Sequence, residues 1–274
     1  LFCDTPREVF SHADEIVAAG VDIPMITKVM LELKKRGLTV YELSRRDSDI
    51  PGIIHIKADV TDGKSVSDAI DRVISEQGRI DILINNAGYG ISGAVEFTPA
   101  EDAMRLFDVN FFGMVRMTEK VIPYMRENGG GRIVNISSVA AVVPIPFQTY
   151  YSASKAAISS YSMALANEVG RFGIRVSAIM PGDISTGFTD ARKKITEGDD
   201  VYRGSVSRSV GTMEKDERGG MDVTKAGAFV AKAAIDRRHK PLYTIGAQYK
   251  LAVLLTKILP AAWLNRLIRI IYAK

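Results

Sequence analysis

Short apolar runs that alternate with helical segments constrain the fold of this chain most strongly. The runs 80–84 (IDILI) and 131–136 (GRIVNI) consist mainly of apolar residues, many of them β-branched. Runs with little polar alternation are typical of parallel strands covered on both faces. Segment 26–36, by contrast, has apolar residues at helical spacing and a suitable stop at Gly37. Such alternation predicts an α/β fold, a doubly wound parallel sheet with helices on both faces.

The same pattern extends along most of the chain. No break in composition divides residues 1–274, so we expect a single domain. Segment 187–223 is polar and charged, with repeated glycine, which is typical of a mobile loop or a helical lid over a substrate. Segment 250–274 is an apolar tail with basic residues and no acid. Further strands are expected at 15–20, 38–43, 53–60 and 241–245, and further helices at 62–77, 98–107, 114–127 and 225–236.

Composition excludes several kinds of protein. The formal charge of +4 permits phosphate-bearing ligands or an anionic membrane surface, but it is too weak to indicate nucleic acid. Cys3 is the only cysteine, which excludes an internal disulfide and a thiolate metal site, and we expect no metal. Residues 1–14 lack the order of a signal peptide. With the single cysteine, this favours a reducing, cytoplasmic location.

Tyr151 and Lys155 stand four residues apart at the start of a helical stretch. This spacing places the phenol and the ammonium on one helix face. A free tyrosine has a pKa of about 10, and an adjacent positive charge favours its ionised form. A nearby hydroxyl such as that of Ser138 would orient a carbonyl or alcohol oxygen against the phenol. The three residues therefore predict an acid/base site.

Six short motifs occur along the chain: Asp59-Val60, Asn85-Asn86-Ala87-Gly88, Asn110, Ser138, Tyr151 with Lys155, and Pro181-Gly182 with Thr186. A lone tyrosine–lysine pair is a weak signal, but six motifs in this order between expected strands are specific. Together they resemble the short-chain dehydrogenase/reductase family over residues 37–186, which implies a Rossmann-like fold. The run 85–96, the sequence around Asn110 and the basic, apolar tail look most like the branch acting on steroids, retinoids and other lipophilic alcohols or ketones.

The resemblance implies roles for four residues. Tyr151 would be the general acid/base that exchanges a proton with the substrate oxygen, and Lys155 would lower its pKa and bind the nicotinamide ribose. Both would therefore also contact the cofactor. Ser138 would hold the substrate oxygen, and Asn110 would maintain a water-linked proton path to Lys155. The tyrosine and the serine that precede Tyr151 and Ser138 are competitors, and Asn110 alone would also suit a helix cap.

The family binds a nicotinamide dinucleotide, and the resemblance places its parts on this chain. Asp59 would accept a hydrogen bond from the adenine amino group, beside the Val60 backbone; the alternative for Asp59 is a turn or cap carboxylate, for which Asp62 is better placed. The other implied contacts are with the adenine ribose, by Asn86, Ala87 and Gly88, and with the nicotinamide carboxamide, by Pro181, Gly182, Ile184 and Thr186. The alternative for the last group is an ordinary strand-ending turn.

The end of the second strand predicts the choice of cofactor. A carboxylate there would bind a ribose 2′-hydroxyl and select NAD, whereas arginine accommodates a 2′-phosphate. Ser44 stands at this place, and Arg45 and Arg46 follow. Guanidinium groups match phosphate geometry, so NADP(H) is predicted; a solvated basic loop is the alternative.

The glycine-rich fingerprint of the first strand–helix turn is largely missing. In the expected register only Gly20 survives, while Pro24 and Ile26 replace the second and third glycines. Proline removes one N–H and isoleucine adds bulk where a pyrophosphate is normally held, and Asp22 adds negative charge. Three explanations are open: a rebuilt loop in an active enzyme, a relative that has lost its nucleotide and acts as a scaffold or regulatory module, or a sequence error within 1–25.

The tail has three interpretations. Charged residues and Pro260 interrupt it, which argues against a transmembrane helix. It would close over an apolar substrate, lie on an anionic membrane surface, or pack on the domain or a sister subunit. Small residues on the helix that follows Tyr151, from Ala153 to Ser160, allow close helix packing, and the family commonly builds its dimer there. We therefore expect a homodimer or homotetramer.

The sequence thus predicts an NADP(H)-dependent oxidoreductase that interconverts a carbonyl and an alcohol on a small lipophilic molecule. The non-enzymatic scaffold is the alternative from another class. An epimerase or dehydratase on the same fold is a further alternative among enzymes.

Overall fold

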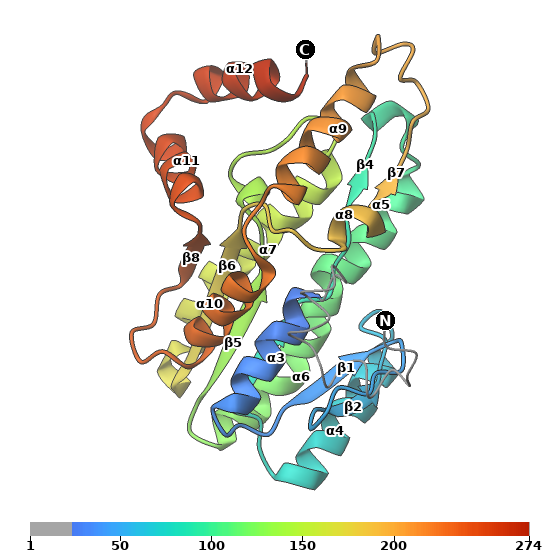
Figure 1. The fold of residues 1–274 in the computed structure, drawn as a ribbon. Helices are drawn as coiled ribbons and strands as arrows, with labels where there is room; N and C mark the ends of the chain where they lie inside the picture. Colours follow the sequence, from blue (N-terminus) through green and yellow to red (C-terminus); the bar gives the residue numbers. More distant parts are fainter. Residues whose placement is uncertain (1–23, 274) are drawn as a thin grey trace.

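The computed structural model describes residues 24–273. The predicted strand at 15–20, with the cofactor residue Gly20, lies outside the described residues. Within them, strands and helices follow one another as predicted (Figure 1). The helices are α3 (Met25–Lys35), α4 (Gly63–Gln77), α5 (Ala100–Phe107), α6 (Gly113–Glu127), α7 (Thr149–Val169), α8 (Phe188–Ala191), α9 (Ser205–Arg218), α10 (Val223–Ile235), α11 (Ala247–Ile258) and α12 (Ala261–Tyr272), with short helical turns η1 (Val95–Phe97), η2 (Asp108–Phe112), η3 (Val139–Ala141) and η4 (Gly170–Phe172).

The strands of the described residues are β1 (Tyr41–Ser44), β2 (Ile54–Lys57), β3 (Ile82–Asn85), β4 (Ile91–Ser92), β5 (Gly131–Ile136), β6 (Ile174–Pro181), β7 (Lys193–Lys194) and β8 (Leu242–Ile245). The main sheet has the order β3-β5-β6-β8, and β1 pairs with β2. A short pair, β4 with β7, stands apart from both. All these pairs are parallel, as predicted. The carboxyl ends of neighbouring parallel strands therefore share one edge, where α/β folds bind ligands.

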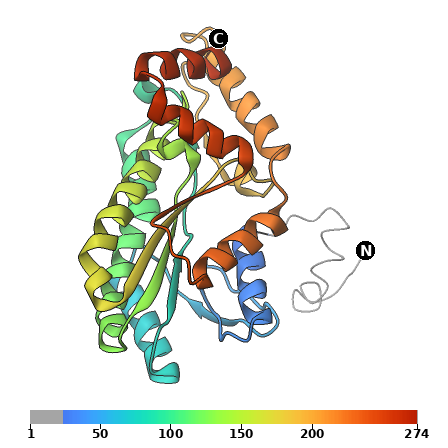
Figure 2. The same cartoon turned by 90° about the vertical axis from the view of Figure 1, so that its left-hand side faces the viewer.

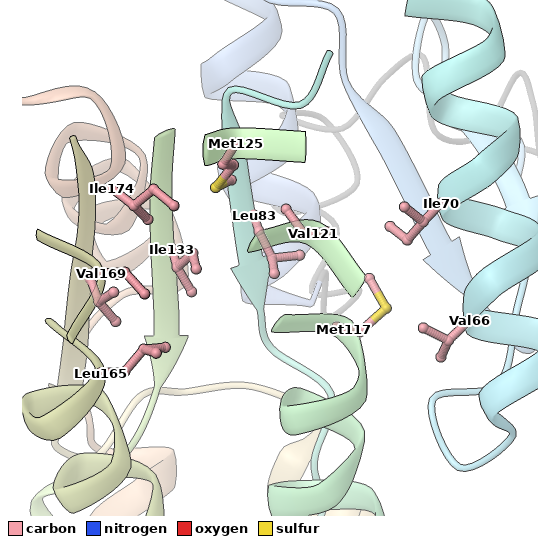
Figure 3. Close-up of a cluster of buried hydrophobic side chains, with 11 residues drawn as sticks. Val66, Ile70, Leu83, Met117, Val121, Met125, Ile133, Leu165, Val169 and Ile174 are labelled. Atoms are coloured by element: carbon pink, nitrogen blue, oxygen red, sulfur yellow. The ribbon is translucent and has the colours of Figure 1, made fainter. Parts of the chain in front are cut away.

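Successive residues of β5 pack against opposite helical layers. Ile133 belongs to a buried cluster with residues of α4, α6 and α7, shown in Figure 3. Val134 and Ile136 belong to a second cluster, with residues of α3 and α10. Figure 2 shows the two layers on either side of the sheet. This period of two explains the low polar alternation of the sequence, because both faces of β5 are covered.

Two strands are shorter than predicted, for local reasons. β1 begins at Tyr41 and not at 38, because Gly37 (φ +82°) and Leu38 close the end of α3 with bonds to the Lys34 and Leu33 carbonyls. β2 ends at Lys57 and not at 60, because the carboxylate of Asp59 accepts from the Thr61 N–H at 2.9 Å and turns the chain.

Asp62 begins α4 as expected, accepting from the Lys64 N–H at 2.8 Å. Segment 187–223 is largely structured: α8, β7 and α9 occupy it, and α9 packs against α12. The tail forms two helices that meet at Pro260. No helix among residues 24–273 is long and apolar enough to cross a bilayer.

Gly173 lies in the tight turn between η4 and β6. It has φ +76°, and a Cβ there would lie 2.8 Å from the Gly129 carbonyl oxygen. We expect Gly173→Ala to lower the free energy of unfolding by about 2 kcal/mol, because left-handed strain and a backbone clash add. Gly37→Ala is the matched control: it has the same backbone conformation with nothing within 4 Å, so about 1 kcal/mol is expected. Urea unfolding measures both, and equal losses would contradict the clash.

Candidate active site

The predicted catalytic residues converge at the carboxyl ends of β5 and β6. Ser138 follows β5 by two residues and begins η3, where its Oγ accepts from the Ala140 N–H at 3.1 Å. Tyr151 and Lys155 lie in the first turns of α7, which packs on β6. The Ser137 hydroxyl, Ser138's competitor, donates to the Lys155 carbonyl at 2.8 Å and so ties α7 to the strand end. Ser137 is thus a structural residue, and Ser138 is the serine beside the phenol.

Lys155 is almost completely buried, with 4% of its surface exposed. Its Nζ donates to the Ile136 carbonyl at 2.8 Å and stands 5.6 Å from the centre of the Tyr151 ring. The two side chains therefore share one helix face, as their spacing predicts.

Asn110 stands in η2, a π-helical turn between α5 and α6, and is 1% exposed. Its Oδ1 accepts from the Tyr89 N–H and its Nδ2 donates to the Tyr89 carbonyl, both at 3.0 Å. A Cβ on Gly88 would lie 3.1 Å from Asn110 Oδ1 and 3.7 Å from Lys155 Nζ. Asn110 therefore does not cap a helix but holds the Gly88–Tyr89 backbone beside the lysine.

The pKa of Tyr151 does not follow the sequence prediction. Burial raises it to about 12, while the Ser138 hydroxyl, and to a smaller extent Arg192, lowers it. The net effect is a raised pKa, so a phenol pKa lowered by Lys155, as the resemblance implies, is not seen in this structure. The Lys155 ammonium is directed to the strand end, and burial lowers the pKa of Lys155 itself to about 8.

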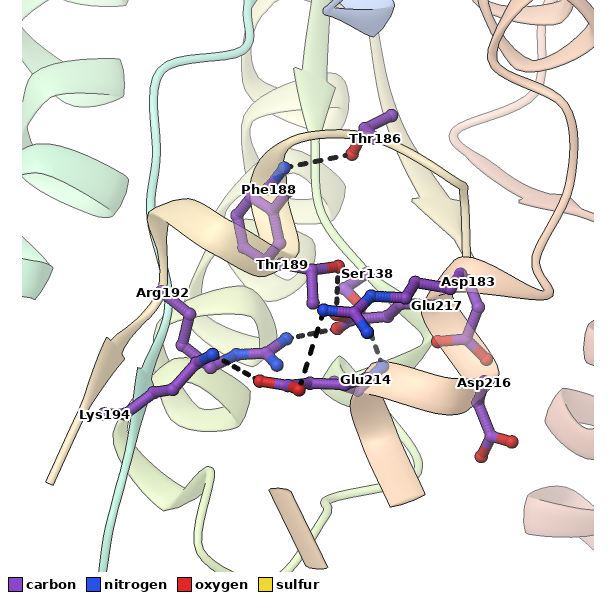
Figure 4. A network of polar contacts seen from close by, with 12 residues as sticks. Ser138, Asp183, Thr186, Phe188, Thr189, Arg192, Lys194, Glu214, Asp216 and Glu217 are labelled. Atoms are coloured by element: carbon purple, nitrogen blue, oxygen red, sulfur yellow. Dashed lines mark hydrogen bonds and ion pairs between the residues drawn. The ribbon is translucent and has the colours of Figure 1, made fainter. Parts of the chain in front are cut away.

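Figure 4 shows a buried ion pair that the sequence did not reveal, and both of its charges act on the pKa of Tyr151. The Arg192 side chain is fully buried and pairs with Glu217 of α9, to which Thr189 also donates at 2.6 Å. Arg192 lies over the Phe188 ring, which in turn contacts Tyr151 at 5.7 Å between ring centres. These residues come from segment 187–223, which has no regular period, so no sequence signal joined them to the site.

The residues after β6 contact the C-terminal helices. A Cβ on Gly182 would lie 2.1 Å from the Tyr249 ring, so only glycine permits this contact. The Tyr249 hydroxyl donates to the Asp183 carboxylate, and burial raises the pKa of Asp183. Further residues of the predicted nicotinamide side are also placed: Pro181 ends β6, Ile184 bridges to Met221, and Thr186 Oγ1 accepts from the Phe188 N–H.

The predicted adenine side lies at the ends of β1, β2 and β3. Asp59 has its pKa lowered first by the Thr61 backbone and further by Arg45 and Arg116, so these charges gather there. Asp59 is thus a turn carboxylate, and one of its oxygens is engaged by Thr61. Two further predicted residues of this side make hydrogen bonds: the Ser44 hydroxyl donates to the Arg46 carbonyl at 2.9 Å, and the Val60 carbonyl accepts from Arg116 at 3.1 Å. Asn86 and Ala87 follow β3 and lead to Gly88.

The start of α3 is less obstructed than the sequence predicts. Pro24 is the cap residue, and the first intrahelical bond is made by the Thr27 N–H, so the amides of Met25 and Ile26 precede the helical ladder. Ile26 packs against the α3–α10 cluster, so its bulk is directed into the protein interior. No acidic residue stands in the first turn of α3, and Asp22, whose charge is expected from the sequence to lie near the phosphates, is outside the described residues. The donor set therefore fits an anionic group, with one N–H fewer than a glycine would give.

These residues fit a dinucleotide better than a metal. Gly88 leaves open the space that a Cβ would fill beside Lys155. At the predicted adenine end, the Asp59 carboxylate lies near Arg45 and Arg116. No cluster of three metal-ligating side chains occurs within residues 24–273.

Comparison with known proteins gives a consistent result. A family model described as short chain dehydrogenase matches residues 12–197. The 3-ketodihydrosphingosine reductase of Bacteroides thetaiotaomicron is 41% identical over 263 residues, covering 94% of this chain and 97% of the relative. A short-chain dehydrogenase structure from Streptomyces avermitilis has a TM-score of 0.76 at 29% identity, covering 89% of this chain and 91% of that one. A xylitol dehydrogenase solved with NAD⁺ has a TM-score of 0.68 at 25% identity, covering 81% and 93%.

Proposed function

This chain belongs to the short-chain dehydrogenase/reductase family of oxidoreductases, and from that premise we propose that it interconverts a carbonyl and an alcohol on a lipophilic molecule with NADP(H). The observation that carries the proposal is the convergence of Ser138, Tyr151 and Lys155 with Asn110 beside Gly88. The site combines a proton donor, a hydroxyl and a buried cation within one helix and two strand ends. Hydride transfer would be supplied by the nicotinamide.

The chain's own residues would manage the proton. Tyr151, protonated at neutral pH because its pKa is about 12, donates to the substrate oxygen during reduction. Ser138 holds that oxygen, and its hydroxyl already lowers the phenol pKa. Lys155 binds the ribose through an ammonium anchored on the Ile136 carbonyl. Asn110 holds the Tyr89 backbone in place beside Lys155.

Two features favour a lipid-like substrate. The relative that is 41% identical is named a 3-ketodihydrosphingosine reductase, and the alignment covers nearly the whole of both chains. The Phe188 ring lies against Tyr151, where an apolar substituent next to the reacting carbon would pack. We propose that segment 187–223 covers the substrate. We further propose that the tail contacts a membrane, where such a substrate resides, and that the protein is otherwise cytoplasmic.

A homo-oligomer is part of the proposal. Phe112 and Met163, on η2 and α7, are large exposed apolar side chains, and Ala153 and Ser160 are exposed on the same helix α7. An apolar, small-residue surface of this kind suits a second copy of the chain.

The test is a reductase assay with the purified chain. With 3-ketodihydrosphingosine and NADPH we expect consumption of NADPH in equal amount to the alcohol formed, and saturable NADPH binding followed by nicotinamide fluorescence. Absence of saturable binding at millimolar NADPH would contradict the enzyme and favour a scaffold. Product formed without net NADPH consumption would indicate an epimerase or dehydratase. NADPH binding without reduction of this ketone would mean that the proposed substrate is wrong, while the proposed cofactor is right.

A further inference from the structure

The outer surface of the two C-terminal helices is apolar. On α11 the exposed large side chains are Leu251, Leu254 and Ile258, at spacings of three and four residues. On α12 they are Trp263, Leu267, Ile270 and Ile271, again on one helical face. These seven residues are called the C-terminal apolar face. Trp263 is the most exposed of them, at 73%.

The inner surface of the same helices is already engaged. Tyr249 lies opposite the α11 stripe and contacts Gly182 and Asp183. Tyr272 lies opposite the α12 stripe and donates to Asp216 of α9 at 3.2 Å, and Ile268 is buried. Both views of the fold place α11 and α12 at the end of the molecule away from α4 (Figures 1 and 2). If α11 and α12 closed over a substrate, they would do so with their inner surface. The C-terminal apolar face therefore needs another binding partner.

The positive charge of the tail indicates the chemistry of that binding partner. Residues 247–274 carry five basic residues and no acid, although the whole chain has a formal charge of only +4. The rest of the chain is thus nearly neutral, and the positive charge belongs to this tail. Lys250 and Lys257 flank the α11 stripe by helical position, and Arg266 flanks that of α12. Long basic side chains beside an apolar stripe are typical of helices that lie in the interface of an anionic membrane.

A second copy of the chain is a poorer match. In a symmetric dimer through the C-terminal apolar face, the same basic residues would meet across the contact. Like charges at an interface rim disfavour association, whereas anionic lipid headgroups would neutralise them.

We propose that the C-terminal apolar face binds an anionic membrane surface, with α11 and α12 lying in the plane of the interface. This deepens the membrane contact of the proposed function, since it names the residues, the orientation and the lipid charge. Tyr249 and Tyr272 connect these helices to Asp183 and Asp216, and the Asp183 carboxylate acts on the pKa of Tyr151. The candidate active site would therefore stand next to the bilayer that holds a lipophilic substrate.

Trp263 provides the readout, because it is the only tryptophan of the chain. Vesicles of phosphatidylcholine with phosphatidylglycerol should shift its emission to shorter wavelength, brominated lipid should quench it, and the protein should co-sediment. Leu254→Asp with Leu267→Asp should abolish binding. Met104→Asp is the matched control, since Met104 is 69% exposed on α5 and should leave binding unchanged. Lys257→Gln with Arg266→Gln should weaken binding to anionic vesicles about thirtyfold.

Each other outcome would overturn the proposal. Equal binding to vesicles of phosphatidylcholine alone would exclude the role of lipid charge. Absence of vesicle binding, with a dimer by light scattering that Leu254→Asp with Leu267→Asp dissociates, would assign the face to a second copy. Vesicle binding is measured without cofactor or substrate, so its failure is distinct from a failure of the reductase assay. Unchanged circular dichroism verifies that each variant is folded.

Discussion

Replacing Tyr151 with phenylalanine should lower kcat for carbonyl reduction by about a thousandfold, the range that a positioned general acid contributes. The substitution removes only the hydroxyl. The ring contacts with Phe188 and the Lys155 ammonium stay available to phenylalanine, so the fold and NADPH binding should be retained. Initial rates of NADPH oxidation measure the loss, and nicotinamide fluorescence measures the binding.

Tyr150 offers the matched control, because it is adjacent, partly buried and also in α7. Tyr150→Phe should change the rate less than twofold. If both variants lose activity equally, the assignment of Tyr151 as the acid fails. If Tyr151→Phe instead raises KM with an unchanged kcat, the phenol binds substrate without transferring its proton.

The protonation state of Tyr151 suits the role of acid in reduction that we propose for it. Burial keeps the pKa of Tyr151 near 12, so the phenol is protonated across the neutral range and is ready to donate. Oxidation of an alcohol needs the phenolate, whose fraction falls tenfold for each unit that the pH lies below that pKa. The expectation from the sequence, a phenol pKa lowered by the neighbouring ammonium, did not include the cost of burying both groups.

The sequence predicted the fold wherever a local pattern carries the information. Buried strands such as β5 have apolar residues on both faces, and the motifs that follow them stand in a fixed order along the chain. The predicted ends of the strands were less exact, because side-chain hydrogen bonds, such as the one that Asp59 accepts from the Thr61 N–H, decide where a strand ends.

The rest depends on contacts between distant segments. Arg192 and Glu217 are 25 residues apart in a region without periodicity, so their pairing beside Tyr151 is visible only after folding. Similarly, the sequence predicts that Ile26 obstructs the phosphate loop, because the motif does not encode the direction of its side chain. The structure packs it against the α3–α10 cluster, which removes one of the objections to nucleotide binding.

Cofactor choice gives the second large effect, through the arginines that follow β1. Arg45 acts on the same carboxylate, Asp59, that marks the predicted adenine end, so a 2′-phosphate there would meet its charge. Arg45→Ala with Arg46→Ala should raise KM for NADPH about a hundredfold and leave KM for NADH nearly unchanged, because only NADPH carries the phosphate that these groups would bind.

Adding Ser44→Asp should lower KM for NADH, because a carboxylate at this strand end accepts from the free ribose hydroxyls. Arg79→Ala is the control, because Arg79 lies before β3, at the amino end of the strand and away from the predicted cofactor site. Its ion pair with Asp81 is exposed. This variant should alter neither constant. An equal rise of KM for both cofactors in the double variant would show that the arginines hold a phosphate common to both, and the NADP(H) preference would then have to come from elsewhere in the site.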